Sequence, residues 1–299
     1  MKQNGVSVII CCFNSSNRIG KTLEYLSKQK ELSNIKWEII IVDNNSTDNT
    51  SIVAKKTWDE LNKVESELRV VVEKKTGLNF AREKGISISN YNYVIFCDDD
   101  NWLNENYIFK TFQFLNENDE YAVVGGNGVE RTEIEPPVWF EKFKSMYAIG
   151  CRNNGEVKNV YGAGMGIKKK LLKSFKPLIS DRKGKSLISG GDSEICHFLT
   201  AKGYKIQQLC DNQFFHFIPK ERLTLRYLQR LAEGRGKSKA MLDVLYKNNL
   251  SMKYRFKNHL LDLFTAFRTV NVYRVMFLTI YIYNYWKQVY SKKENFIQN

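Results

Sequence analysis

Three adjacent carboxylates, Asp98, Asp99 and Asp100, directly follow a run of apolar residues at the end of the first third of the chain. The apolar run, Tyr93 to Cys97, is uncharged and rich in β-forming residues, which predicts a buried strand of a parallel sheet. Neighbouring carboxylates repel one another, so a bound cation or a hydroxyl-rich ligand would compensate their charge. The alternative is a solvated acidic turn before a helix expected from about Asn104, since Asp is also common in turns and helix caps.

Two further strands are expected to end near these acids. β-branched stretches predict strands over residues 6–13, which are uncharged, and over residues 37–42, and polar residues beginning with Asn14 and Asp43 follow them. Apolar residues at helical spacing come after each strand, so strands and helices alternate as in βαβ units. The sequence therefore predicts an α/β fold with a mainly parallel sheet. Since parallel strands share one carboxyl edge, these polar groups should line one binding cleft.

The chain after residue 102 is predicted to be less regular. A short strand is expected over residues 121–125, ended by a glycine-rich turn at 125–128, and a strand-like segment is expected over residues 161–167. Two more short strands are expected over residues 205–209 and 213–217. The glycines of segment 161–167 lack the G-x-G-x-x-G spacing of a dinucleotide site, so we interpret them as points of close backbone approach.

From Pro219 onward the composition becomes helical, basic and aromatic. One long helix is expected over residues 223–245, interrupted around Gly234 and Gly236. We therefore predict two domains, with residues 1–218 forming the α/β domain and residues 219–299 forming a basic helical extension.

Charge and cysteine content narrow the possible partners and setting. The 46 Lys and Arg residues outnumber the 32 Asp and Glu residues, and the formal net charge of +14 favours phosphate groups, nucleic acid or an acidic membrane surface. The six cysteines form no C-x-x-C pair, which predicts reduced core thiols rather than a disulfide framework or a zinc site. Without a recognisable signal peptide or a stretch long enough to cross a bilayer, the protein is expected on the cytosolic side of the membrane.

Several of these segments together resemble the family 2 glycosyltransferases, whose catalytic domain has the GT-A fold. The matching segments, in chain order, are residues 6–10 with Phe13 and Asn14, 41–48, 77–82, 98–100 and 190–194. The first three are similar to the family's donor-site motifs, the fourth to its D-x-D motif and the last to its catalytic-base segment. The resemblance covers about residues 5–218.

The resemblance implies an inverting, metal-dependent glycosyltransferase that moves a sugar from a nucleotide-diphosphate donor to an acceptor hydroxyl. Asp100 would be the main ligand of Mn²⁺ or Mg²⁺, with Asp98 contacting the metal or the ribose. Asp43 would contact the base or the ribose, and Arg82 would support the nucleotide. The donor-binding residues implied by the motifs are Phe13, Asn14, Asp43, Asn45, Arg82, Asp98 and Asp99.

Asp192 is the residue that the resemblance implies as general base, which would remove the proton of the attacking acceptor hydroxyl. Family members often carry Glu-Asp at this point, whereas this chain has Gly191 and Asp192, so Glu194 is the second candidate. The structural alternative is that Asp192 caps a helix expected over residues 195–202.

The resemblance implies His216 as a third candidate metal ligand, since some relatives use a histidine at this point and imidazole suits manganese. The alternative is a structural histidine on an apolar strand.

The resemblance further implies a glycan or polyprenyl-diphosphate-linked acceptor in surface polysaccharide synthesis. The basic segment Lys220 to Lys247 and the tail Tyr254 to Lys293 mix cationic and aromatic residues as interface-binding helices do. We therefore expect peripheral contact with the anionic inner face of the cell membrane. The alternatives are a solvated helix face and a packing or oligomerisation element.

Two other functions compete with this interpretation. A nucleic-acid-binding protein would explain the net charge and the aromatic residues, but no nucleic-acid module is recognisable, and we expect no nucleic-acid partner. A nucleotidyltransferase can share a similar sheet and acidic metal site. It would ordinarily need a glycine-rich and basic phosphate loop after the first strand, where this chain has Asn14 to Asn17.

Overall fold

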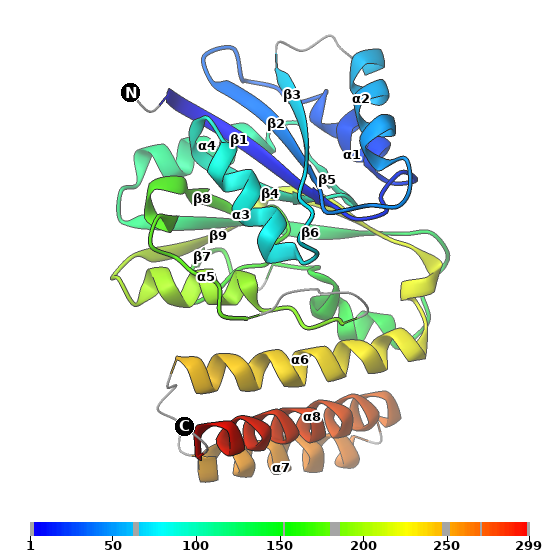
Figure 1. The fold of residues 1–299 in the computed structure, drawn as a ribbon. Helices are drawn as coiled ribbons and strands as arrows, with labels where there is room; N and C mark the ends of the chain where they lie inside the picture. Colours follow the sequence, from blue (N-terminus) through cyan, green and yellow to red (C-terminus); the bar gives the residue numbers. More distant parts are fainter. Residues whose placement is uncertain are drawn as a thin grey trace. The chain divides into compact units, whose positions relative to one another are not determined.

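The chain forms two compact units. The computed structural model describes residues 3–61, 66–151, 153–179, 186–246, 252–269 and 271–297 (Figure 1). The first unit consists of residues 1–133, 144–177 and 191–218, and the second of residues 134–143, 178–190 and 219–299. The last boundary falls between residues 218 and 219, whereas two shorter segments from the middle of the chain belong to the second unit.

The first unit is built on a sheet in which, within the described residues, nine strands have the order β3-β2-β1-β4-β8-β6-β9-β5, with β7 paired to β9. The strands are β1 (Gln3–Cys12), β2 (Lys36–Asp43), β3 (Glu67–Val72), β4 (Tyr91–Asp98), β5 (Asn101–Leu103), β6 (Tyr121–Thr132), β7 (Gly155–Glu156), β8 (Gly166–Lys168) and β9 (Lys205–Ile218). The strands β1 to β4, β6 and β9 run in one direction, and β5, β7 and β8 run in the other. The sheet is therefore mainly parallel, as predicted.

Helices cover both faces of this sheet (Figure 1). They are α1 (Ile19–Leu26), α2 (Thr50–Leu61), α3 (Leu78–Ile88), α4 (Tyr107–Glu117) and α5 (Gly191–Thr200). Val8 and Ile10 of β1 pack in a core with α1, α2 and α4, while the intervening Ile9 packs in a core with α3 and α5. Since successive side chains of a strand point to opposite faces, the continuous apolar runs of the central strands are explained by burial on both sides.

The glycine-rich segment after residue 125 is not a turn, contrary to the prediction. β6 continues through it from Tyr121 to Thr132. A Cβ atom on Gly126 would collide with the Tyr107 hydroxyl group, and one on Gly128 would collide with the Ala148 carbonyl oxygen. These glycines therefore allow neighbouring groups to approach a strand closely, which composition alone cannot distinguish from a turn.

Two other strand predictions need correction. Residues 205–218 form the single strand β9 rather than two short strands, because it pairs along the long strand β6 across a register shift. In the segment 161–167 only the end belongs to β8, because Gly164 has a φ of +71° and turns the chain just before the strand begins.

The prediction that all six cysteines are reduced is wrong, because Cys151 and Cys210 form a disulfide. These residues are 59 positions apart, and the antiparallel pairing of β7 with β9 brings their neighbours together. The spacing of cysteines along the chain carries no information on such a contact. The free cysteines among the described residues are Cys11, Cys12, Cys97 and Cys196.

In its described residues, the second unit contains three long helices, α6 (Leu225–Leu245), α7 (Met252–Arg268) and α8 (Val272–Ile297). The predicted interruption of α6 is absent. Its two glycines are instead points of close approach, since a Cβ on Gly234 would collide with the Leu187 carbonyl and one on Gly236 with the Tyr281 carbonyl. Among the described residues, none of the helices is both long and apolar enough to cross a membrane.

Candidate active site

The acids predicted to share one edge of the sheet do so. In the strand register Asp43 of β2 lies opposite Cys12, and Asp98 of β4 lies opposite Cys11 on the other side of β1. Neighbouring strands are ~4.8 Å apart, so the two acidic positions are separated by ~10 Å across the end of β1. Parallel strands end together here, and this end forms the edge at which open α/β sheets bind ligands.

Asp43 holds the loop that follows β2. Its Oδ1 accepts a hydrogen bond from the Ser46 backbone N–H at 2.9 Å, and its Oδ2 accepts one from the Ser51 hydroxyl. Asn44 connects this loop to the loop after β3, since its Oδ1 accepts a hydrogen bond from the Gly77 backbone N–H at 2.8 Å. Asn45 is exposed and has a left-handed φ of +63°. The contacts of Asp43 and Asn45 with a nucleotide remain predictions.

Asn14 links the exit of β1 to the same loop. Its backbone N–H donates to the Ser46 hydroxyl at 3.0 Å, and its side-chain Oδ1 accepts from the Thr47 backbone N–H at 2.8 Å. The neighbouring Phe13 side chain is half exposed and carries no comparable polar tie. Asn14 therefore shapes the edge, while Phe13 presents an aromatic surface there for which donor contact remains a prediction.

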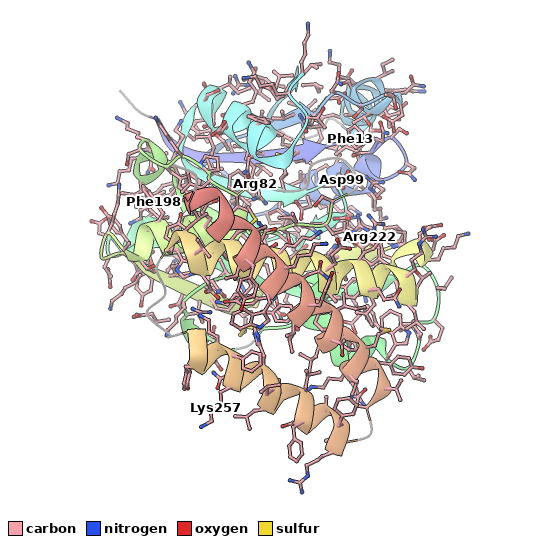
Figure 2. All side chains as sticks on the ribbon, turned by 60° about the horizontal axis from the view of Figure 1, so that its bottom comes forward. Phe13, Arg82, Asp99, Phe198, Arg222 and Lys257 are labelled. Atoms are coloured by element: carbon pink, nitrogen blue, oxygen red, sulfur yellow. A yellow bond between two sulfur atoms is a disulfide. The ribbon has the colours of Figure 1, made fainter. Side chains whose placement is uncertain are left out.

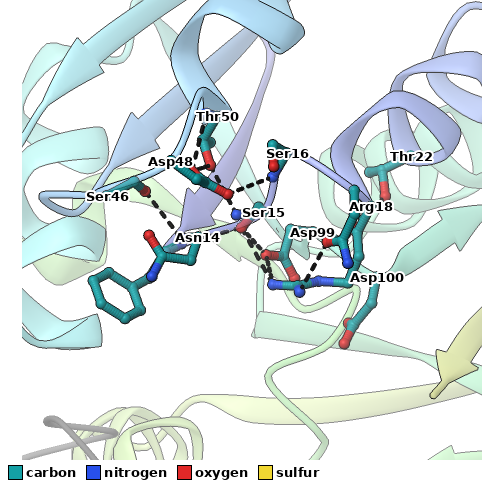
Figure 3. Close-up of polar contacts among 12 residues, drawn as sticks. Asn14, Ser15, Ser16, Arg18, Thr22, Ser46, Asp48, Thr50, Asp99 and Asp100 are labelled. Atoms are coloured by element: carbon teal, nitrogen blue, oxygen red, sulfur yellow. Dashed lines mark hydrogen bonds and ion pairs between the residues drawn. The ribbon is translucent and has the colours of Figure 1, made fainter. Parts of the chain in front are cut away.

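Asp99 is engaged by the beginning of helix α1 (Figure 3). Its Oδ2 accepts a hydrogen bond from the Ser15 hydroxyl and forms an ion pair with Arg18 Nη2 at 2.7 Å, and its carbonyl oxygen accepts from the Thr22 hydroxyl at 2.8 Å. Burial and the adjacent Asp100 raise the pKa of the Asp99 carboxyl group, while Arg18 lowers it. Asp99 thus ties β4 to α1, and its predicted donor contact has to coexist with these bonds.

Arg18 and Ser15 were not predicted from the sequence. Arg18 precedes Asp99 by 81 positions, and a basic residue at the start of an amphipathic helix looks like an ordinary surface residue. The useful signal would have been an excess of three acids at one strand end, which calls for a cation from elsewhere in the chain.

The ion pair between Arg18 and Asp99 is expected to stabilise the fold measurably, because the two side chains are only 22% and 12% exposed. We expect Arg18→Leu and Asp99→Asn each to lower the free energy of unfolding by ~1–3 kcal/mol. The double variant should show a coupling of ~0.5–3 kcal/mol in urea unfolding. The exposed pair Lys21 and Glu24 is the control, with a coupling of at most ~0.5 kcal/mol. Strict additivity at Arg18 and Asp99 would contradict the assignment.

Asp100 and His216 face one another in the interior of the site. The pairing of β5 with β9 brings them together, and their exposed fractions are 3% and 8%. His216 Nδ1 lies 2.6 Å from the Tyr147 carbonyl oxygen. Because a carbonyl oxygen only accepts hydrogen bonds, Nδ1 must carry a proton, and in the neutral ring Nε2 keeps its lone pair. Nε2 is 3.6 Å from Asp100 Oδ1.

This pair fits a divalent cation. The separation of 3.6 Å is too long for a hydrogen bond, whereas two ligand atoms ~2.1 Å from one cation lie at most ~4.2 Å apart. A carbonyl group that fixes the other ring nitrogen is the usual second partner of a ligating histidine. Within the part of the chain that the structure describes, no group of three or more His, Cys, Asp or Glu side chains could hold a metal ion by itself. Further ligands would therefore have to come from elsewhere, such as substrate phosphates or water.

Asp192 lies in the first turn of α5, where its carboxylate is half-buried. Its Oδ2 accepts from the Gly162 backbone N–H at 3.0 Å, and its Oδ1 accepts from the Ser193 backbone N–H at 2.7 Å. Glu194, the second candidate base, is fully buried. A base must contact the acceptor hydroxyl, so burial favours Asp192 over Glu194.

Arg82 joins the region of Asp192 to the strand ends. A Cβ atom on Gly162 would meet Arg82 Nη2 at 2.7 Å and Asp192 Cβ at 3.3 Å, so both side chains lie against this glycine. The Arg82 guanidinium group also lies over the Phe96 ring of β4, 5.0 Å from its centre. Figure 2 shows Arg82 and Asp99 on the sheet portion of this unit. The missing side chain of Gly162 thus lets a cation and the candidate base approach one another.

The Cys11 thiol lies close enough to Arg82, Asp98 and Asp99 for their charges to affect its pKa. Burial raises its pKa to about 12, and of the nearby charges Arg82 lowers this pKa whereas Asp98 and Asp99 raise it. Cys11 therefore stays a neutral thiol at physiological pH and is not a nucleophile. Arg82 of α3 and the acids at the end of β4 therefore all lie near Cys11, at the end of β1.

Comparison with known proteins identifies the family. Residues 7–175, more than half of the 299-residue chain, match the model of the family described as Glycosyl transferase family 2. The chain belongs to glycosyl transferase family 2. This member of the family is therefore a transferase enzyme, and the interpretations as a nucleic-acid-binding protein or a nucleotidyltransferase give way to that assignment.

Relatives of this glycosyltransferase include poly(ribitol-phosphate) beta-N-acetylglucosaminyltransferase TarP from Staphylococcus aureus strain N315. The two are 29% identical over 140 residues, which make up 46% of this chain and 41% of TarP. The chain thus spans less than half the length of this relative.

Solved structures establish the fold of the glycosyltransferase. Mannosyltransferase PcManGT from Pyrobaculum calidifontis, in complex with GDP-Man and Mn²⁺, has a TM-score of 0.65 at 17% identity over 95% of this chain and 87% of its own. S. aureus TarS 1-349, in complex with UDP, has a TM-score of 0.52 at 20% identity over 87% of this chain and 70% of its own. The predicted GT-A fold is confirmed.

Proposed function

We propose that this glycosyltransferase moves a sugar from a nucleotide-diphosphate donor to an acceptor hydroxyl with inversion, using Mn²⁺ or Mg²⁺. The observation that carries the proposal is the facing pair of Asp100 and His216 at the same sheet edge as Asp43 and Asp98. The complexes of the similar structures with UDP and with GDP-Man and Mn²⁺ support this choice of donor and metal.

On the donor side, Asp100 and His216 would hold the divalent ion, with its remaining ligands supplied by substrate phosphates or water, and Asp98 would contact the ribose. When bound, such an ion supplies positive charge that offsets the negative charge on the diphosphate. Arg82 places a further cation at this end of the sheet. Asp43 and Asn45, at the end of β2, would contact the base and the ribose, and Asp99 would keep β4 fixed against α1.

On the acceptor side, Asp192 would act as general base. The acceptor oxygen forms a bond to the anomeric carbon while the bond from that carbon to the phosphate oxygen breaks, and the hydroxyl proton passes to an Asp192 carboxylate oxygen. The two backbone N–H groups that donate to Asp192 orient the carboxylate. Asp192 itself remains partly exposed at the beginning of α5.

The acceptor is proposed to be a glycan or a polyprenyl-diphosphate-linked saccharide in cell-surface polymer synthesis. The relative TarP is named for a poly(ribitol-phosphate) activity, and this chain has a net charge of +14, which suits an anionic acceptor. The basic helices after residue 219 would hold the enzyme at the anionic inner face of the cell membrane.

A donor screen tests the proposal. The purified chain is incubated with UDP- and GDP-sugars, with Mn²⁺ and with Mg²⁺, and release of the nucleoside diphosphate is measured. We expect release from one class of donor, and we expect a chelator to abolish it. Equal release with and without chelator would refute the metal, and no release from any donor, with or without a glycan acceptor, would contradict the proposed transfer.

A further inference from the structure

Some large apolar residues of the second unit are packed in its interior, and others are exposed. On α8, Tyr285 and Val289 are buried and form a small core with Ala240 of α6. On α7, in contrast, five large apolar side chains are more than half exposed: Phe256 (52%), Leu260 (51%), Leu261 (52%), Phe264 (60%) and Phe267 (62%). Part of the basic aromatic tail therefore serves packing, and α7 presents an apolar surface.

A buried polar network determines which side of α7 faces inward. Arg255 of α7 forms an ion pair with Asp243 of α6, and both residues are 8% exposed. Asp243 also accepts a hydrogen bond from the Tyr285 hydroxyl at 3.1 Å. His259, one turn after Arg255, accepts a hydrogen bond from the Trp286 indole N–H at 3.2 Å. Rotating α7 about its axis would break the Arg255 pair, and breaking a buried ion pair is costly.

Four of these five exposed residues lie together on another side of α7, and Leu261 lies ~60° beyond them. With 3.6 residues per turn, Phe256, Leu260, Phe264 and Phe267 fall within a sector of ~80°, which we term the α7 ridge. The buried residue Ala266 lies on the Arg255 side, well outside this sector. The network that holds Arg255 inward therefore keeps Leu260, Phe264 and Phe267 of the α7 ridge outward, while the half-exposed Phe256 ring also packs edge-on against Trp286 of α8 at 5.8 Å between ring centres.

Positive charges border the α7 ridge. Lys257 points away from α8, as Figure 2 shows, and the Arg268 guanidinium group lies over the Phe264 ring at 5.8 Å. The only acidic residue in the sequence of α7 is Asp262, against Lys253, Arg255, Lys257 and Arg268. An exposed apolar stripe with cationic residues alongside it is typical of helices that lie in the interface of an anionic bilayer.

We propose that the α7 ridge inserts into the interface of an anionic lipid bilayer, with Lys257 and Arg268 contacting lipid phosphates. This inference rests on the membrane attachment proposed above and narrows it to one helix face, but it does not depend on the transfer chemistry. Charge favours lipid over a second copy of the chain, because two copies would bring like charges together around their ridges.

Vesicle binding tests the proposal on the full chain. We expect the wild-type chain to sediment with vesicles of phosphatidylglycerol and phosphatidylcholine, and more weakly with phosphatidylcholine alone. Phe264→Ser combined with Phe267→Ser should lower the partition coefficient at least tenfold. Lys257→Glu combined with Arg268→Glu should remove the preference for anionic vesicles. Ile52→Ser, which changes a side chain of α2 with 66% exposure, is the matched control and should bind as the wild type does.

The outcomes separate this inference from the proposed function. Release of nucleoside diphosphate from a soluble donor should be the same in all these variants, since the α7 ridge has no part in the catalytic machinery. Equal vesicle binding by the wild type and the ridge variant would overturn the proposal. The wild-type chain could instead fail to bind vesicles and be a dimer by light scattering, while the ridge variant is a monomer. That result would show that a second copy of the chain covers the α7 ridge.

Discussion

Asp192→Asn is expected to lower the rate of sugar transfer by ~10²–10⁴-fold, the usual contribution of a general base. An amide cannot take the proton of the acceptor hydroxyl, but it keeps the size of the carboxylate, and its single oxygen can accept one of the two hydrogen bonds that Gly162 and Ser193 donate to Asp192. The affinity for the donor should therefore stay within a factor of a few. Both quantities are measured, turnover with donor and acceptor together and binding by calorimetry with the donor alone.

Two further variants make this test specific. Ser193→Ala changes the adjacent residue and keeps the backbone N–H that orients Asp192, so its turnover should stay near that of the wild type. Glu194→Gln should affect stability more than turnover, because Glu194 is fully buried. If Asp192→Asn retained full turnover while Glu194→Gln lost it in a folded protein, the base would have to be reassigned to Glu194.

Asp100→Asn is expected to lower transfer by ~10²–10³-fold, since a metal that offsets developing charge contributes several kcal/mol and each ~1.4 kcal/mol is tenfold in rate. The variant should also need a higher Mn²⁺ concentration for half-maximal activity, because a neutral amide is a weaker ligand than a carboxylate. A metal titration of turnover for wild type and variant measures both effects.

His216 and Asp211 provide the comparison for this prediction. His216→Asn should shift the metal titration in the same direction, since its Nε2 faces Asp100. Asp211→Asn is the control. Asp211 also lies on β9, but its side chain is 70% exposed and pairs with Lys110, so its titration should match the wild type. An unchanged titration in Asp100→Asn would refute Asp100 as a metal ligand.

Much of the fold could be predicted from the sequence, because the burial of a strand and the point where it ends both leave a pattern in neighbouring residues. The apolar runs of β1, β2 and β4 are buried on both faces, and each is followed by polar residues where the strand reaches the sheet edge. The apolar run and the polar residues after it are both visible in consecutive residues, so the sheet edge that carries Asp43 and Asp98 could be predicted.

Errors arose where a residue serves contacts that are distant in the sequence. Gly126 and Gly128 suggested a turn but accommodate Tyr107 and Ala148 in a continuous strand. Gly236 suggested a break in α6 but accommodates the backbone of α8. A glycine has the same local signature in each case, and only the neighbour in space shows which role it has.

The alternation of strands and helices, the acidic sheet edge and the residue types available for chemistry could all be inferred from the order of residues. The pairing of distant residues emerged only from the three-dimensional fold: His216 with Asp100, Arg18 with Asp99, Cys210 with Cys151, and an inward Arg255 that leaves the α7 ridge outward. Periodicity records whether a side chain is buried, which is a property of its own segment. The identity of the group that it meets depends on the strand order and on helix packing, and neither is encoded within a single segment.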